Sequence, residues 1–171
     1  MSSKITYATM FNPPADTHVR FDAAMAEVVA ALGASHGLHI DGQDVAGAGE
    51  DERASPIDRR RILGRFPLAS AAQAARAMEV AHAAFPAWRA TPMAERISLL
   101  KRVARLIEER VFHIAAALTL EVGKNRMEAL GEVQETADFF DLYAEDYERH
   151  EGFEHALPDD PLQASARAIA A

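Results

Sequence analysis

The stretch from Asn125 to His150, NRMEALGEVQETADFFDLYAEDYERH, decides how the rest of the chain is interpreted. Apolar residues recur along it at spacings of three and four, which predicts one long helix with an apolar stripe. That stripe consists of Leu130, Val133, Ala137, Phe140, Ala144 and Tyr147. A second, mixed stripe on the opposite side holds Gly131, Glu135, Phe139 and Leu142. Two large apolar residues on that second side indicate that the helix lies between other parts of a larger body.

Glu135, on the second stripe, has two interpretations. It is either a solvated helix residue, as most glutamates are, or a carboxylate held among apolar neighbours. A carboxylate in apolar surroundings commonly has a function. The local pattern leaves both interpretations open.

Composition places the chain among soluble globular proteins. Its 171 residues suffice for one domain with a real core, and 49% of them are hydrophobic. The net charge of −8 argues against nucleic-acid and anionic-membrane partners, which need basic patches. No apolar run approaches the roughly 20 residues of a membrane span, and the N-terminus lacks a signal-peptide core, so we expect a cytoplasmic protein. The chain contains no cysteine, which excludes disulfides, thiolate metal ligands and a cysteine nucleophile within it.

The first third of the chain is expected to form a helix and a hairpin. The helix is capped by Asp16 or Thr17 and stops at Gly33. Its apolar face consists of Phe21, Met25, Val28, Val29 and Leu32. The following segment, HGLHIDGQDV at residues 36–45, contains Asp41-Gly42 between apolar residues, which predicts a hairpin turn.

Residues 46–56, AGAGEDERASP, are expected to be a loop because of their composition. Gly47-Ala48-Gly49 begins like a dinucleotide-binding fingerprint, but the third glycine is missing. No apolar strand precedes it and no helix clearly follows, so we reject a phosphate cradle there. Residues 60–66, RRILGRF, are expected to form a further short strand.

From Ser70 onward the pattern is helical. Ser70 caps an alanine-rich helix that Pro86 is expected to end, and Trp88 is expected to fill the core from a short connection. The buried face of that helix is predicted to hold Ala74, Met78, Ala81 and Phe85. Thr91-Pro92 is typical of the start of the next helix. The stripe of that helix contains Ile97, Leu100, Val103, Ala104 and Ile107, and a shorter helix follows at residues 112–122.

No assembled active site follows from local chemistry. His36 and His39 are interpreted as surface residues of the hairpin, because no further ligand lies at metal-site spacing. The acids of the long helix form a solvated flank, and no Ser-His-Asp arrangement can be defended. We therefore assign no catalytic, cofactor-binding or metal-ligating residue from local patterns.

Several segments between residues 36 and 161 resemble the N-terminal part of the aldehyde dehydrogenase superfamily. They are HIDGQDV, SPIDRRRILGRF, AHAAFPAWRATPMAERISLLKRVARLIEERV, LTLEVGKN and ETADFFDLYAEDY. Within it, EVGKNRMEALGEVQETADFF is most similar to the 1-pyrroline-5-carboxylate dehydrogenases, also called L-glutamate 5-semialdehyde dehydrogenases. The helix at Arg20 to Leu32 also resembles that branch. Many other branches have proline after GK, where this chain has Asn125.

The resemblance implies NAD-dependent oxidation of L-glutamate 5-semialdehyde to glutamate, a step of proline catabolism, by an enzyme that forms homo-oligomers. In that family a cysteine thiolate attacks the aldehyde, hydride passes to NAD, and a glutamate base activates water. By position, Glu135 corresponds to the glutamate that approaches the substrate amino group, and Phe139 to a wall of the same pocket. The catalytic cysteine, the oxyanion asparagine and the coenzyme site do not appear in this chain.

The expected fold is therefore mainly α with a small β-hairpin, an incomplete N-terminal portion of the α/β aldehyde dehydrogenase fold. We divide it into an N-terminal extension with one helix (1–35), a truncated aldehyde dehydrogenase part (36–161) and an unrelated tail (162–171). Alone, it is expected to bind no NAD, to have no activity, and to expose apolar helix faces that make it poorly soluble or molten. The alternative is a non-catalytic helical module that binds and regulates a full-length dehydrogenase.

Overall fold

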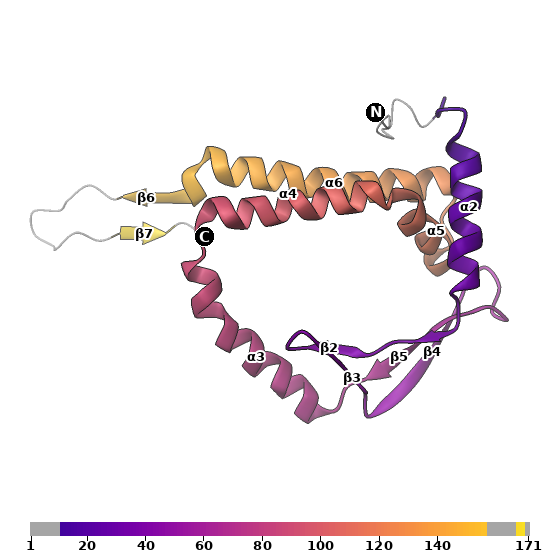
Figure 1. The fold of residues 1–171 in the computed structure, drawn as a ribbon, viewed down its shortest axis with the longest axis horizontal. Coiled ribbons are helices and arrows are strands. Elements are labelled where there is room, and N and C mark those ends of the chain that lie inside the picture. The colour runs from indigo at the N-terminus through magenta and orange to yellow at the C-terminus, as the bar shows by residue number, and fades with distance from the viewer. Residues whose placement is uncertain (1–10, 157–166, 170–171) are drawn as a thin grey trace, which may run out of the picture.

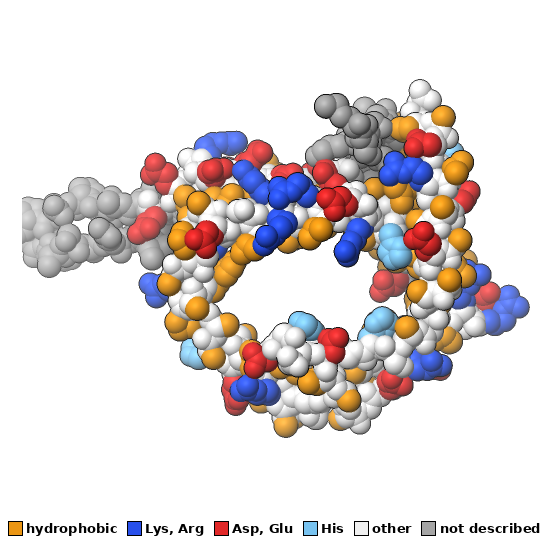
Figure 2. Space-filling view, viewed as in Figure 1, with side chains coloured by type: hydrophobic (Ala, Val, Ile, Leu, Met, Phe, Trp, Pro, Cys, Tyr) orange, Lys and Arg blue, Asp and Glu red, His pale blue; other side chains and the backbone are white. Residues whose placement is uncertain are grey.

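The computed structural model describes residues 11–156 and 167–169, which form an open ring (Figure 1). Helices α4 (Met93–Glu109) and α6 (Arg126–Arg149) lie side by side along one side of the ring. Helices α2 (Thr17–Ala30) and α5 (Val111–Val122) pack at one end of this pair. A small sheet and helix α3 (Ala71–Ala90) complete the ring, and its centre is also open in the space-filling view (Figure 2).

The main core lies where α2, α5 and α6 meet. Leu130 of α6 and Ala115 and Ala116 of α5 are fully buried there, against Phe21 and Val28 of α2. The predicted stripe of α6 is confirmed. Leu130, Val133, Ala137 and Ala144 are buried, and Phe140 and Tyr147 are half-buried. The stripe of α4 is confirmed in part, because only Ile97 and Ala104 are fully buried.

The turn that orients α6 is specified by two residues. Gly123 ends α5 in a left-handed conformation (φ 80°), which glycine adopts without a steric penalty. Asn125 then caps α6, and its side-chain oxygen accepts hydrogen bonds from the backbone N–H groups of Met127 and Glu128 at 3.1 and 3.0 Å. The end of α5 and the start of α6 are therefore specified by the residues between the two helices.

The predicted hairpin is confirmed. Strands β2 (Leu38–Ile40) and β3 (Gln43–Val45) pair antiparallel, with Leu38 opposite Val45. Asp41 and Gly42 between them both have positive φ, as a tight two-residue hairpin turn requires. The expected strand at residues 60–66 is present as β5 (Ile62–Leu68).

The prediction of a loop at residues 46–56 was wrong for its second half. Gly49–Ala54 forms strand β4, which pairs antiparallel with β5, while β1 (Ala34–Ser35) pairs parallel with β5 on its other side. Strand β4 lies at the edge of this three-stranded sheet and is almost entirely exposed. It therefore has the polar composition of a loop and no apolar alternation.

Helix α3 differs from its prediction in two ways. Its start is as expected, because Ser70 and Gln73 form a reciprocal capping box. Pro86, however, lies inside the helix, and Trp88 belongs to its last turn and is 48% exposed, so it does not fill the core. The carbonyl of His82, which Pro86 cannot bond, is on an exposed helix where water can solvate it. The predicted buried face is also wrong, since no residue of α3 is buried.

Thr91 belongs to the end of α3 more than to the start of α4. Its hydroxyl donates to the carbonyl of Ala87 at 3.0 Å, and Pro92 occupies the capping position of α4. The cap of α4 is therefore Pro92, one residue later than the expected cap, Thr91.

Short elements follow α6 after His150. A short 3-10 helix, η1 (Glu151–Phe153), leads into β6 (Glu154–Ala156), which pairs antiparallel with β7 (Arg167–Ile169). The rest of the predicted tail, residues 162–166 and 170–171, lies outside the described residues. Among the helices that the structure describes, none is long and apolar enough to cross a membrane.

Candidate functional site

Glu135 and Phe139 lie one helical turn apart on the face of α6 that points away from the core, so their side chains are neighbours. The interpretation of Glu135 as a carboxylate held among apolar neighbours was wrong for this chain, because Glu135 is exposed. Residues Gly131 and Leu142, from the same stripe, are also half-buried or exposed. The second stripe is therefore open to solvent on the described chain.

Phe139 lines an apolar pocket of about 310 Å³ between α4 and α6. Its ring is 44% exposed and stacks on Tyr143 with the ring centres 5.7 Å apart. Tyr143 also lines the pocket, together with Leu100, Thr136 and Phe140. The Thr136 hydroxyl donates to the carbonyl of Glu132 at 2.8 Å, so it is directed at its own helix. The pocket thus offers apolar contact, and Glu135, which precedes Thr136 in the sequence, is not one of its lining residues.

Gln134 fixes the helix beneath this surface, and sequence patterns did not identify it. It is only 5% exposed and donates from its side-chain nitrogen to Glu108 of α4 at 3.0 Å and to Asp138 of α6 at 3.1 Å. This polar link crosses from α6 to α4 next to the apolar stripe. The sequence did hold one indication of a buried Gln134, namely its position one residue after Val133 of the apolar stripe. A polar residue at the edge of an apolar stripe is the kind that a neighbouring helix can bury and satisfy.

The two histidines interpreted as surface residues are exposed. His39 contacts Asp44 across the hairpin at 3.0 Å, and the His36 ring stacks on Phe66 with centres 4.9 Å apart. Within residues 11–156 and 167–169, no three histidine, aspartate or glutamate side chains gather as metal ligands would.

Gly47-Ala48-Gly49 does not fit a coenzyme. This segment leads into strand β4, not into a helix, and a side chain at Gly47 would meet the carbonyl oxygen of Leu68 at 2.7 Å. The glycine is therefore needed for close packing on β5. A dinucleotide site needs a strand, a glycine-rich turn and a helix N-terminus in that order, which this segment does not supply.

Comparison with known proteins gives the same family as the motifs. The sequence model of the aldehyde dehydrogenase family matches residues 46–168. The chain is 34% identical over 124 residues to 1-pyrroline-5-carboxylate dehydrogenase 2 of Bacillus subtilis, a match that covers 72% of this chain and 24% of that protein. It is 42% identical over 98 residues to N-succinylglutamate 5-semialdehyde dehydrogenase of Serratia proteamaculans, covering 57% and 20%. The chain thus spans a quarter or less of these relatives.

Solved structures agree. The fold superposes on a 1-pyrroline-5-carboxylate dehydrogenase from Thermus with bound NAD, with a TM-score of 0.83 and 27% identity, over 94% of this chain and 30% of that one. A Mycobacterium tuberculosis enzyme of the same name, with NAD and cobalamin, gives a TM-score of 0.75 and 25% identity over 88% and 28%. Both the resemblance and the expected fold class are confirmed, and the chain belongs to the aldehyde dehydrogenase family.

Proposed function

We propose that this chain forms a substrate-recognising part of an NAD-dependent dehydrogenase that oxidises L-glutamate 5-semialdehyde to glutamate. The observation that carries the proposal is that an exposed carboxylate, Glu135, lies one helical turn from Phe139, which lines the apolar pocket. Relatives named for 1-pyrroline-5-carboxylate and for N-succinylglutamate 5-semialdehyde support a substrate of this class. We further propose that the assembled enzyme is a cytoplasmic homo-oligomer.

The substrate carries an ammonium group and a carboxylate on one carbon at one end and an aldehyde at the other, joined by methylene carbons. The carboxylate of Glu135 would attract the ammonium group, and Phe139 would pack against the methylene carbons. A further polypeptide segment that covers this face of α6 would remove water from Glu135 and strengthen the attraction. The neighbouring link from Gln134 to α4 would keep α6 from rotating and so hold both side chains in place.

The oxidation itself needs groups that these 171 residues do not contain. There is no cysteine to attack the aldehyde, and Gly47-Ala48-Gly49 does not fit the coenzyme. The role of this chain in the reaction is therefore limited to binding and orienting the substrate.

The first test uses the purified 171-residue chain with NAD and L-glutamate 5-semialdehyde. We expect no NADH by absorbance at saturating substrate, because no thiolate is present. Turnover that persists after removal of host dehydrogenases would contradict the proposal.

The second test uses the full-length Bacillus subtilis relative, with the residue aligned to Glu135 changed to alanine. Loss of one charge-assisted contact is expected to raise KM for the semialdehyde about tenfold, with little change for a simple aliphatic aldehyde. The matched control is alanine at the residue aligned to Glu145, which is exposed further along the same helix. An equal rise in KM for both aldehydes would show that Glu135 does not recognise the amino group.

A second function, a helical module that binds a full-length dehydrogenase, is favoured by one observation on α3. Met78, Phe85 and Trp88 are all exposed on this helix, which buries none of its residues. Exposed apolar side chains of this size are typical of a surface that contacts another polypeptide. Co-purification of the chain with a full-length homologue would support this function, and no binding to any homologue would eliminate it.

A further inference from the structure

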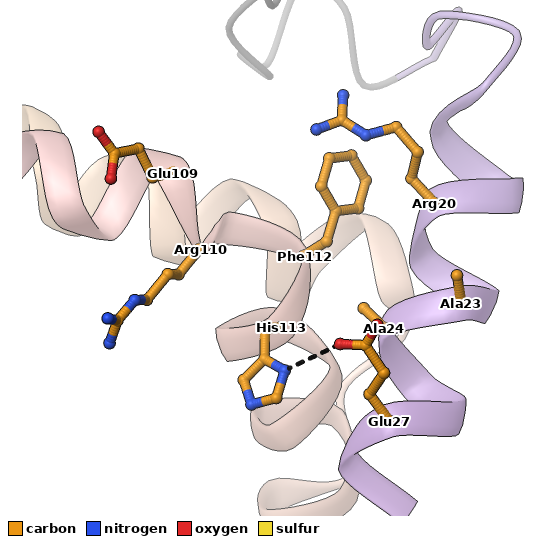
Figure 3. Close-up of a pocket in the computed structure, with 8 residues that line it drawn as sticks. All are labelled: Arg20, Ala23, Ala24, Glu27, Glu109, Arg110, Phe112 and His113. Carbon is orange, nitrogen blue, oxygen red and sulfur yellow. Dashed lines mark ion pairs between the residues drawn. The ribbon is translucent and has the colours of Figure 1, made fainter.

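A second pocket, of about 540 Å³, lies where α2 meets the junction of α4 and α5 (Figure 3). It shares only α4 with the Phe139 pocket, to which its Glu109 does not contribute, and no step of the proposed function uses it. One wall is a stripe of α2, and the facing wall holds Phe112 and His113 from the first turn of α5. The stripe consists of Arg20, Ala23, Ala24 and Glu27.

The α2 wall has a cation at one end, an apolar centre and an anion at the other end. Spacings of three, four and seven residues put all four side chains on one face of the helix. At a rise of 1.5 Å per residue, Arg20 and Glu27 are separated by about 10 Å along the axis. Ala23 and Ala24 between them are small, so the wall is hollow at its centre.

The cationic end is held in place by Phe112. The guanidinium carbon of Arg20 lies 4.1 Å from the centre of the Phe112 ring, a cation–π contact that limits the movement of a long side chain. A guanidinium stacked by its face keeps its N–H donors at the edge, where a carboxylate binds. An oxygen of Asp16, the residue just before α2, is 3.8 Å from the Arg20 guanidinium, which is a weak ion pair between two exposed side chains.

The anionic end is only loosely occupied. An oxygen of Glu27 lies 3.8 Å from Nδ1 of His113, at the outer limit of an ion pair, and both side chains are mostly exposed (Figure 3). When His113 is neutral, the negative charge of Glu27 is not balanced by this contact. An ammonium group could therefore bind here without displacing a strong interaction.

The outer rim of the pocket also carries one positive and one negative side chain. Glu109 and Arg110, at the end of α4, line the same pocket and carry one charge of each sign. A simple anion would meet two glutamates and a simple cation two arginines, so neither is complementary to the pocket as a whole. A molecule with one charge of each sign at opposite ends has no such conflict.

We propose that this pocket binds an elongated zwitterion of the ω-amino carboxylate class. Its carboxylate accepts hydrogen bonds from Arg20, its ammonium group donates to Glu27, and its methylene chain lies over Ala23, Ala24 and Phe112. The apolar centre selects a ligand whose charges are separated by a chain of several carbons, and so excludes short α-amino acids.

The experiment is a titration of the isotope-labelled 171-residue chain, followed by amide NMR signals of α2 and the first turn of α5. The probe is 6-aminohexanoate. The controls are hexanoate, which lacks the ammonium group, hexylamine, which lacks the carboxylate, and glycine, which lacks the long methylene chain. We expect saturable shifts with 6-aminohexanoate and at least about tenfold weaker binding of each control. Equal affinity for hexanoate or hexylamine, shifts outside the pocket, or no saturation at ~10 mM would overturn the proposal.

Charge reversal separates binding from a merely structural effect. Arg20→Glu and Glu27→Arg should each weaken 6-aminohexanoate about tenfold or more. The double variant restores both charges in the opposite order and should regain binding, because a zwitterion can reverse its direction. Arg102→Glu and Glu145→Arg, at exposed positions of α4 and α6, are matched controls that should bind as the unchanged chain does. Failure of the double variant to regain binding, with the circular dichroism spectrum unchanged, would refute the assigned contacts.

Discussion

Replacing leucine by alanine at two positions of α6 tests how this helix packs. Leu130 is fully buried in the core with α2 and α5, and Leu142 is 52% exposed on the opposite stripe. The chemical change and the change in helix propensity are the same at both positions, so they cancel in the comparison. The difference in free energy of unfolding therefore reports burial alone.

The magnitudes follow from the two environments. Truncation removes three carbons, which at roughly 0.8 kcal/mol per buried CH₂ is about 2.4 kcal/mol at Leu130. The cavity left in a packed core adds to this, so we expect about 3 to 4 kcal/mol. At Leu142 about half of the transfer energy is already lost to exposure and no closed cavity forms, so about 1 kcal/mol or less is expected.

Urea unfolding followed by circular dichroism at 222 nm measures both variants. With an m-value of about 2 kcal/mol/M, the midpoint should fall by about 1.5 to 2 M for Leu130→Ala and by about 0.5 M or less for Leu142→Ala. Equal shifts would refute the reasoning, because they would mean that α6 is not packed specifically on α5 and α2, as in a molten state.

Two further predictions concern local interactions. Asn125→Ala should lower the free energy of unfolding by about 1 kcal/mol through loss of the α6 cap. The control Asn12→Ala, at an exposed position before α2, should change the free energy of unfolding little. Equal urea midpoints for the two variants would contradict the capping role. The side-chain hydrogen bond from Arg60 holds the pKa of Asp58 below its ordinary value, so an Arg60→Ala variant should titrate Asp58 at higher pH by NMR, while Arg59→Ala should not. A lowered carboxyl pKa stabilises the fold above the unfolded pKa, and this effect is lost as pH falls through the folded pKa. Any contribution of Asp58 is therefore present at neutral pH and lost on the acid side.

The helical part of the fold was predictable because a helix that is buried on one side has apolar residues at spacings of three and four in its sequence. The stripe from Leu130 to Tyr147 and the Asp41-Gly42 turn were both found where the sequence indicated. Strand β4 was not, because both of its faces are exposed and its place in the sheet depends on pairing with the distant β5. Pro86 was also misleading, since an exposed helix tolerates a lost hydrogen bond that a buried one could not.

The candidate site was predictable only through resemblance. Patterns alone left Glu135 undecided between a solvated and a functional residue, and the structure places it in solvent on the described chain. The pocket beside Phe139 depends on Leu100 from α4, a contact between helices that spacing within α6 cannot reveal. The same holds for the Gln134 link to Glu108, because the partner is 26 residues away in the chain.

Helix α3 has a consequence for how the ring moves. Its first two turns are held by the capping box and by the bonds of Gln73 to Ala46 and Arg76 to Asp41, and the rest of the helix buries no side chain. Most helical stability in proteins comes from tertiary packing, and α3 buries none of its residues, so α3 should open with a free energy far below that of the α2, α5 and α6 core. Its amide hydrogens should exchange with deuterium long before those of Leu130 and Val133, and a protease should cut it first. The ring of Figure 1 is thus expected to be one member of an ensemble in which α3 repeatedly unfolds while the helical core stays intact.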